Sequence, residues 1–428
     1  MKLQNASQPK ELSPLSALAA GASGNLIEWY DFYVYAAFSL YFADSFFPNA
    51  DPLAQMLSTS GIFALGFFMR PIGALIFGRI GDRVGRGRAL TLSVLLMCSG
   101  SLLIAVTPSY AVIGIAAPSI LLLARMLQGI SLGGEYGSSA AYLAEIAPKN
   151  LRGFYSSFQT VTMLAGQLLA LGVLIILQNL FLDSSELKIW GWRIPFAFGG
   201  LLASAAFWLR RGLVEPKAFK QASKDSHQGS LSLLLHHRRE TATVVGLTLG
   251  GTIAFYTYTT YMQKFLKLST GLNHKETSWI LAGSLLFAIV LQPLYGALSD
   301  RIGRRPMLIT FGALGALLTW PLLNAIQQAT SSKEAFILIC CGWLIISFYT
   351  SINAIVKAEL FPATIRVTGV ALPYALTVSL FGGSAEYVAL SFKSHGHEDW
   401  FYIYVSLAIS ISLCVFVAMT DTKGKTLK

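Results

Sequence analysis

The chain has 428 residues, of which 54% are hydrophobic and only 12% are charged. Soluble domains carry about twice this charged fraction, so the composition excludes an ordinary soluble protein and indicates an integral membrane protein. The net charge of +11 does not indicate a nucleic-acid-binding protein, because the Lys and Arg residues lie in short segments between long apolar runs.

These apolar runs predict an all-α integral membrane fold with about twelve transmembrane helices. About 20 apolar residues cross the core of a bilayer as a helix, and the runs are too long and too unbroken to be alternating strands. The expected spans are residues 17–43, 53–81, 89–107, 116–146, 153–180, 191–211, 242–266, 277–299, 306–328, 335–361, 367–392 and 400–419.

The basic residues between the runs predict the orientation of the chain. Cytoplasmic loops carry an excess of Lys and Arg, and placing the N-terminus inside puts most of the basic residues into cytoplasmic loops. Twelve spans then return the C-terminus to the same side. We therefore expect a multi-pass protein of the cell inner membrane with both termini in the cytoplasm.

Two charged patterns that each occur twice indicate an internal duplication. The pattern Gly-x-x-x-Asp-Arg-x-Gly-Arg occupies residues 78–86 and returns at residues 296–304, about half the chain later. The pattern Glu-x-x-Pro-x-x-x-Arg occupies residues 145–152 and returns at residues 359–366. Two similar halves are typical of transporters that bind their substrate between them.

The duplication also predicts domain boundaries and a gate. We expect six-helix bundles at residues 1–211 and 241–428, joined by a cytoplasmic linker at residues 212–240. The repeated charged residues would close a cytoplasmic gate through hydrogen bonds that break on inward opening. Orienting charge alone would explain the Arg residues but not the repeated acids. The expected gate residues are Asp82, Arg86, Glu145, Arg152, Asp300, Arg304, Glu359 and Arg366.

Two arginines that fall within the spans are candidates to bind an anionic substrate. A charge at mid-membrane costs at least a few kcal/mol, so each needs a partner or a task. Arg70 and Arg125 would suit a carboxylate, because a guanidinium offers it a planar pair of donors. The alternative is permanent pairing with a carboxylate of a neighbouring span, and for Arg125 a role in proton coupling is equally open.

Carboxylates within the spans are the candidates for proton coupling, since all six His residues lie in predicted loops. Glu28 and Asp31, about 60° apart, share one face of the first span, and Glu135 lies in a Gly-rich segment of the fourth. Burial and neighbouring charges bring such a group into a range where it exchanges protons. The alternative is that Glu28 and Asp31 are fixed partners of the arginines.

The second half of the sequence offers hydroxyl and amide groups in place of charges. Such groups could orient the far end of a ligand through neutral hydrogen bonds, although packing alone would explain any single tyrosine. The candidates are Tyr256, Tyr258, Tyr261, Tyr349 and Asn353.

Sequence signatures of enzymes and of metal sites are missing. The sequence has no His-Glu-x-x-His pattern, no Gly-x-x-x-x-Gly-Lys loop and no His or Cys cluster. We therefore expect no enzyme activity, no cofactor and no metal. The expected partners are a small-molecule anion, protons and the lipid bilayer, but not nucleic acid.

Taken together, these segments resemble the major facilitator superfamily. The cluster at residues 78–86 is similar to the hallmark loop of that family, and residues 125–129, Arg-Met-Leu-Gln-Gly, are similar to its fourth-helix motif. Residues 24–32, 70–73 and 133–137 resemble the metabolite:proton symporter branch. The resemblance implies twelve helices in two pseudo-symmetric bundles and transport by alternating access.

A narrower resemblance concerns the substrate. Residues 190–196, 255–264 and 381–390 resemble carriers of α-ketoglutarate. The resemblance implies a monomeric proton symporter that imports a dicarboxylate, with α-ketoglutarate as the first expectation. Citrate, shikimate or an osmolyte of the betaine and proline type is the alternative substrate.

Overall fold

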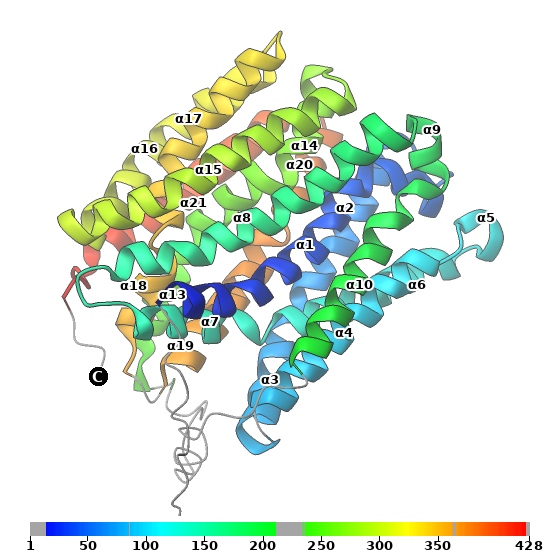
Figure 1. The fold of residues 1–428 in the computed structure, drawn as a ribbon. Helices are drawn as coiled ribbons and strands as arrows, with labels where there is room; N and C mark the ends of the chain where they lie inside the picture. Colours follow the sequence, from blue (N-terminus) through cyan, green and yellow to red (C-terminus); the bar gives the residue numbers. More distant parts are fainter. Residues whose placement is uncertain (1–13, 85, 211–233, 235, 363–364, 425–428) are drawn as a thin grey trace, which may run out of the picture.

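The computed structural model describes residues 14–84, 86–210, 234, 236–362 and 365–424. Helices account for most of these residues, and no strand occurs among them (Figure 1). The predicted all-α fold is therefore confirmed.

The described helices fall into two sets, which we call the first half and the second half. The first half consists of α1 (Pro14–Phe46), α2 (Pro52–Phe68), α3 (Arg70–Val84), α4 (Arg86–Val106), α5 (Tyr110–Ile113), α6 (Ala116–Leu132), α7 (Glu135–Ile146), α8 (Arg152–Ile176), the π-helical turn η1 (Leu177–Phe181), α9 (Ser184–Glu186), the π-helical turn η2 (Leu187–Gly191) and α10 (Arg193–Arg210). The second half consists of α13 (Arg238–Tyr256), the π-helical turn η3 (Thr257–Tyr261), α14 (Met262–Phe265), the π-helical turn η4 (Leu266–Thr270), α15 (His274–Ile302), α16 (Arg304–Gln327), α17 (Ser332–Thr350), α18 (Asn353–Leu360), α19 (Arg366–Thr377), the π-helical turn η5 (Val378–Gly382), α20 (Ala385–Ser394) and α21 (Glu398–Ala418).

Each predicted span coincides with one helix or with helices that follow one another directly. Several of these stretches are long and apolar enough to cross a bilayer on their own, so the chain is a multi-pass membrane protein. Among the described residues these are Pro52–Phe77, Arg152–Phe181, His274–Ile302, Arg304–Gln327, Ser332–Leu360, Arg366–Ser394 and Glu398–Ala418.

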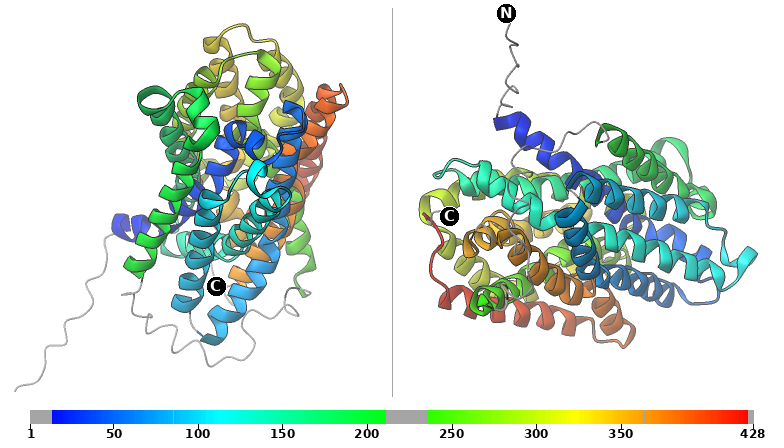
Figure 2. Two further views of the ribbon diagram at one scale, coloured as in Figure 1. Left: turned by 90° about the vertical axis from the view of Figure 1, so that its right-hand side faces the viewer. Right: turned by 90° about the horizontal axis from the view of Figure 1, so that it is seen from below.

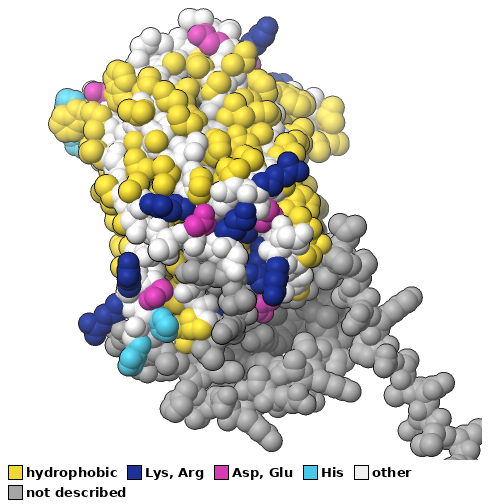
Figure 3. Space-filling view, turned by 90° about the vertical axis from the view of Figure 1, so that its left-hand side faces the viewer, with side chains coloured by type: hydrophobic (Ala, Val, Ile, Leu, Met, Phe, Trp, Pro, Cys, Tyr) yellow, Lys and Arg dark blue, Asp and Glu magenta, His cyan; other side chains and the backbone are white. Residues whose placement is uncertain are grey.

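The outer surface has the character expected of a protein surrounded by lipid. Large apolar side chains such as Leu201, Leu294 and Leu407 are more than half exposed. On the face drawn in Figure 3, hydrophobic side chains form a broad band, and most charged side chains gather below it. This distribution separates a lipid-facing zone from a polar end.

The two halves pack side by side, as the view from below in Figure 2 shows. The largest contact between them is that of α8 with α15, and further contacts join α2 to α20 and α7 to α19. In Figure 1, α8 and α15 run next to each other along most of their length. The interface between the halves is therefore helical throughout the described part of the chain.

A proline in the second predicted span leaves a backbone carbonyl without its helical donor, and this carbonyl makes one contact between the halves. Pro71 has no N–H to offer the carbonyl of Phe67, four residues earlier. Ser379 of the second half fills this vacancy, because its Oγ donates to the Phe67 carbonyl oxygen at 2.6 Å. The same break, between α2 and α3, places Arg70 at the start of α3.

Two other interruptions are used in the same way. The carbonyl oxygen of Thr259, in the π-helical turn η3, accepts from the hydroxyl of Tyr33 at 3.0 Å. The carbonyl oxygen of Thr350, where α17 ends, accepts from Thr160 Oγ1 at 2.7 Å. Asn353 Nδ2 of the second half donates to the same carbonyl oxygen of Thr350 at 2.8 Å. Since a bilayer offers no water to a backbone carbonyl, a hydroxyl of the opposite half helps to satisfy each interruption.

Glycines let α6 cross α2 and α3 in backbone contact. A Cβ atom on Gly133 would lie 2.1 Å from the carbonyl oxygen of Arg70, and one on Gly66 would lie 3.0 Å from the carbonyl oxygen of Arg125. Gly129 and Gly133 have the four-residue spacing that permits close helix packing in membranes. The crossing therefore fixes the backbones of the two arginines relative to each other.

Candidate substrate, proton and gate site

The guanidinium of Arg70 is buried among aromatic rings. Arg70 is 4% exposed, and its Cζ atom lies 3.9 Å from the ring centroid of Phe67 and 4.9 Å from that of Phe32. Ring faces attract a cation but are poor acceptors for its N–H groups. Nε and Nη2 of Arg70 find no hydrogen-bond partner among the described residues. A buried guanidinium whose N–H groups lack acceptors is suited to bind an anion, because the anion would supply those acceptors.

A cavity between the two halves adjoins Arg70. Its wall combines residues of the first half with residues of α19 in the second half. The lining residues are Asn25, Glu28, Trp29, Arg70, Leu132, Gly133, Tyr136, Ala371, Tyr374 and Ala375. A mostly apolar wall with a few convergent polar groups is typical of a site for a small metabolite.

Arg125 does not line this cavity and instead begins a buried chain of hydrogen bonds. Its Nη1 donates to Gln128 Oε1 at 2.7 Å, and Gln128 Nε2 donates to Asp31 Oδ2 at 2.9 Å. Ser101 Oγ donates to the other oxygen of Asp31. The arrangement thus connects Arg125 to the carboxylate of Asp31 rather than to the cavity.

The two acids of α1 have different surroundings although they lie one helical turn apart. Glu28 lines the cavity, whereas Asp31 belongs to the chain that leads to Arg125. The side chain of the third candidate, Glu135, lies outside the described residues, so its role in proton coupling stays a prediction.

Of the four predicted tyrosines, Tyr256 is the one beside Arg70. Its ring packs at 5.2 Å against that of Phe67, the ring over which the guanidinium of Arg70 lies. The other three contact residues of the second half: Tyr258 packs on Trp343, Tyr261 donates to Glu398 and Tyr349 packs on Phe311. None of the four predicted tyrosines lines the cavity.

Asn353 lies beside a fully buried lysine, Lys357 of α18. Lys357 Nζ donates to Asn353 Oδ1 at 3.1 Å and to the hydroxyl of Tyr136 at 3.3 Å. The ring of Tyr374 lies 4.2 Å below the same nitrogen. Lys357 is absent from the predicted substrate residues because its position in the sequence suggests only the cytoplasmic end of a span.

A buried ion pair, also missing from the predicted site, joins Lys264 of α14 to Glu386 of α20. Lys264 Nζ donates to Glu386 Oε1, and the two side chains are 1% and 2% exposed. Glu386 also interacts electrostatically with Arg125 across the interface. The sequence did give a signal for Glu386, because it is an acid within a predicted span. It gave none for the partner, Lys264, because the pairing depends on the tertiary fold.

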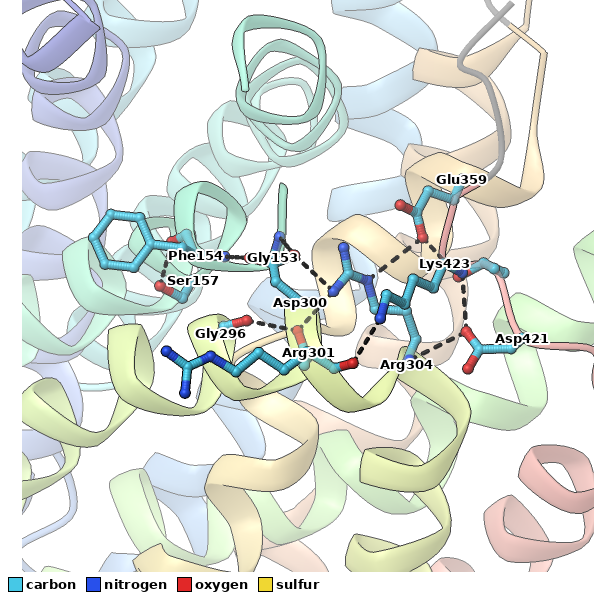
Figure 4. A network of polar contacts seen from close by, with 12 residues as sticks. Gly153, Phe154, Ser157, Gly296, Asp300, Arg301, Arg304, Glu359, Asp421 and Lys423 are labelled. Atoms are coloured by element: carbon cyan, nitrogen blue, oxygen red, sulfur yellow. Dashed lines mark hydrogen bonds and ion pairs between the residues drawn. The ribbon is translucent and has the colours of Figure 1, made fainter. Parts of the chain in front are cut away.

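Several predicted gate residues form a network at the end of α15 (Figure 4). Asp300 accepts from the backbone N–H groups of Gly153 and Phe154 at 2.8 and 2.9 Å, so an acid of the second half caps the N-terminus of α8 in the first. Arg304 Nη1 donates to Asp300 Oδ1 at 2.9 Å, and Arg304 Nε lies 3.7 Å from Glu359 Oε2.

A second contact between the halves joins the Glu-x-x-Pro-x-x-x-Arg repeats. Arg366 Nη1 of the second half donates to Glu145 Oε1 of the first half at 2.6 Å. In the other copy, Arg152 interacts electrostatically with Glu359. The acid of the first copy and the arginine of the second are thus paired across the interface. The side chains of Asp82 and Arg86 lie outside the described residues.

Comparison with known protein families gives one match that covers nearly the whole chain. The model of the family described as "Sugar (and other) transporter" matches residues 17–219 and 209–428.

Curated relatives are similar over most of their length. The α-ketoglutarate permease of Escherichia coli (strain K12) is 50% identical over 417 residues, which cover 96% of this chain and 95% of the permease. The citrate-proton symporter of Klebsiella pneumoniae is 36% identical over 374 residues, 86% of this chain and 83% of the symporter. The proline/betaine transporter of Escherichia coli (strain K12) is 30% identical over 428 residues, 96% and 84% of the two chains.

A solved structure shares the fold. The xylose transporter XylE from E. coli, in a partially occluded inward open conformation, superposes with a TM-score of 0.73 and covers 97% of this chain and 99% of the transporter. The two sequences are 18% identical, so this likeness concerns the fold alone.

Proposed function

The chain belongs to the sugar (and other) transporter family of the major facilitator superfamily, and we propose that it is a proton-coupled symporter that imports a dicarboxylate by alternating access. α-Ketoglutarate is the first candidate, because the permease for this compound is 50% identical over 96% of the chain. The proposal includes location in the cell inner membrane with both termini in the cytoplasm, a monomeric state and no enzyme activity.

One observation carries the assignment of an anionic substrate. Arg70 is buried at a cavity between the halves, and two of its nitrogens lack partners among the described residues. A zwitterionic osmolyte would bring a second positive charge to this cation, whereas a carboxylate would accept from both nitrogens. The cavity therefore favours an anion over betaine or proline.

We propose that an intramembrane acid carries the coupled proton, with Glu28 and Asp31 of α1 and the predicted Glu135 as the candidates. Asp31 is held by Ser101 and by Gln128, which also binds Arg125, and Glu28 stands on the cavity wall. Moving a dianion into a cell with a negative interior costs about 2.3 kcal/mol of electrical free energy per charge at a membrane potential of 100 mV. Two accompanying protons would make the step electroneutral, and three would let the membrane potential assist it.

The moving parts are proposed to be the predicted bundles at residues 1–211 and 241–428, with residues 212–240 as the linker. The contact of Asp300 with the N-terminus of α8 and the pair of Glu145 with Arg366 would close the cytoplasmic side. Opening inward would break both contacts, as rocking of one bundle against the other requires.

The test of the substrate assignment is labelled α-ketoglutarate uptake by the wild type, Arg70→Lys and Arg70→Ala at matched surface expression. A lysine keeps the charge but loses the planar fork, so both variants should lose most of the uptake. Near-normal uptake by the Lys variant would remove Arg70 from the carboxylate site.

Competitors separate the proposed substrate from its alternatives. Succinate, citrate, shikimate and betaine are added in excess during uptake by the wild type. Dicarboxylates are expected to compete. If betaine, citrate or shikimate competes and dicarboxylates do not, the competing compound becomes the substrate assignment. The transporter fold is not affected by this outcome.

A further inference from the structure

Lys357 is a buried cation with an unusual set of neighbours. It is 0% exposed, and its Nζ contacts an amide oxygen of Asn353, the hydroxyl of Tyr136 and the ring face of Tyr374. All of these groups are neutral. No carboxylate among the described side chains lies within ion-pair distance of it, in contrast to Lys264, which is bonded to Glu386.

A charge removed from water and surrounded only by neutral groups is costly to keep. Neutral oxygens and ring faces recover part of the lost hydration, but a carboxylate would recover much more. Such a residue is expected where a charged ligand completes the site, because intramembrane charges that lack a fixed partner mark ligand and ion paths.

Two tyrosines connect Lys357 with the cavity at Arg70. Tyr136 of α7 and Tyr374 of α19 stack with ring centroids 3.6 Å apart, and both line the cavity that Arg70 lines. The two cations therefore share one aromatic wall, to which each half of the protein contributes one ring.

We propose that Lys357 binds the second carboxylate of the substrate, with Arg70 binding the first. The proposal rests on the function proposed above and specifies its site. The carboxylate carbons of a five-carbon dicarboxylate are roughly 5 Å apart, four bonds of about 1.5 Å, too far for one cation to hold both. In the empty carrier, Tyr136 and Tyr374 cover Lys357, and the substrate replaces their neutral contacts when it binds.

In this proposal, each half of the protein contributes one of the two cations that bind the substrate. Arg70 belongs to the first half and Lys357 to the second, so a dicarboxylate bound to both would link the halves. A monocarboxylate could occupy only one of the anchors. Only a substrate with two carboxylates would therefore hold the two halves of the carrier together.

The test compares two ligands on the purified full chain in detergent: α-ketoglutarate and 2-oxopentanoate, in which a methyl group replaces the distal carboxylate. Binding is measured by titration calorimetry for the wild type, Lys357→Met and Lys393→Gln. Lys393 serves as the control because it is a partly buried lysine paired with Glu398 and does not line the cavity.

The wild type and Lys393→Gln are expected to prefer the dicarboxylate by about tenfold or more, as a charged hydrogen-bonded contact provides. In Lys357→Met this preference should fall to about one, with 2-oxopentanoate bound as before. The same variant should also melt at a higher temperature than the ligand-free wild type, because it no longer buries a charge among neutral groups.

Three outcomes would overturn the proposal in distinguishable ways. A wild type that binds α-ketoglutarate, together with an unchanged preference in Lys357→Met, removes Lys357 from the site and leaves the proposed function standing. A lower melting temperature with equal loss of both ligands assigns Lys357 a structural role. A wild type that binds neither ligand overturns the proposed function and this assignment with it.

Discussion

Gln128 is the side chain that connects a buried arginine with a buried acid. Its amide oxygen accepts from Arg125 and its amide nitrogen donates to Asp31, so the two bonds fix which way the amide points. The sequence alone identified Arg125 and Asp31 as charges in need of partners. It could not identify Gln128 and Ser101 as the groups between them, because neutral polar residues are common in spans and their neighbours depend on helix packing.

Asp31→Asn tests the role of this chain in coupling. An amide of the same size cannot release a proton, so uptake driven by an inward proton gradient should be abolished, whereas exchange of substrate for substrate should survive. Both are measured in proteoliposomes. Ser101→Ala keeps the carboxylate and should retain gradient-driven uptake. Wild-type gradient-driven uptake by Asp31→Asn would exclude Asp31 as the proton carrier.

The pair of Lys264 and Glu386 makes a prediction about stability. Glu386→Gln leaves an unpaired ammonium in a fully buried place, and removal of one partner of such a pair costs about 3–5 kcal/mol. Thermal unfolding in detergent should show a clearly lower midpoint. The double variant Lys264→Met with Glu386→Leu should recover most of the loss, and equal midpoints for Glu386→Gln and the wild type would contradict the prediction.

At the scale of helices, the sequence predicted the spans well and their interior breaks poorly. Length and apolar composition are sufficient to find a helix that must cross lipid. The π-helical turn at Thr257–Tyr261 has no comparable signature, since its residues also suit an α-helix, and the bond from Tyr33 that uses the turn comes from the other half. Pro71 did offer a signal, because a proline removes a hydrogen bond from a helix, but the predicted span at residues 53–81 continues through it.

The glycine crossing of α6 with α3 gives a prediction at this scale. Gly133→Ala places a Cβ atom 2.1 Å from the carbonyl oxygen of Arg70, so the helices must separate. Overpacking of this kind costs about 1–3 kcal/mol, and displacement of Arg70 should weaken α-ketoglutarate binding. Thermal unfolding and calorimetry measure the two effects.

Gly172→Ala, in α8, is the matched control. A Cβ atom there meets no heavy atom within 4 Å, and alanine favours a helix over glycine by roughly 0.5–1 kcal/mol. This variant should bind the substrate as the wild type does and should be slightly more stable. Normal stability and binding in Gly133→Ala would show that the crossing tolerates a wider separation than the geometry indicates.

For the whole molecule, one acid of the repeated patterns, Asp300, acts as a helix cap that reaches across the interface. Asp300 binds two N–H groups of α8 and the guanidinium of Arg304. The duplication in the sequence predicted a set of gate residues that includes Asp300, and their gating role stays a prediction. It could not predict that Asp300 would bind backbone groups, because that depends on where the N-terminus of α8 meets α15.

Asp300→Asn tests the gate. The amide keeps an acceptor but loses the charge pair with Arg304 and one of the two backbone contacts, so the cytoplasmic ends of the halves should separate more often. Distances between spin labels at positions 149 and 301 should lengthen, while α-ketoglutarate binding persists. Asp183→Asn is the control, because Asp183 caps the short helix α9 within one loop. An unchanged distance distribution in Asp300→Asn would exclude the gating role.

The three bonds in which a hydroxyl of one half donates to a backbone carbonyl of the other have a consequence for the balance between conformers. The donors are Tyr33, Thr160 and Ser379, and each bond contributes about 0.5–1.5 kcal/mol net. Together they favour the closed interface by about 3 kcal/mol, a population ratio of roughly 150 to 1. A ligand that binds one conformer a few hundredfold more tightly can reverse such a ratio. The contribution of these three bonds is therefore small enough for a single bound metabolite to offset it.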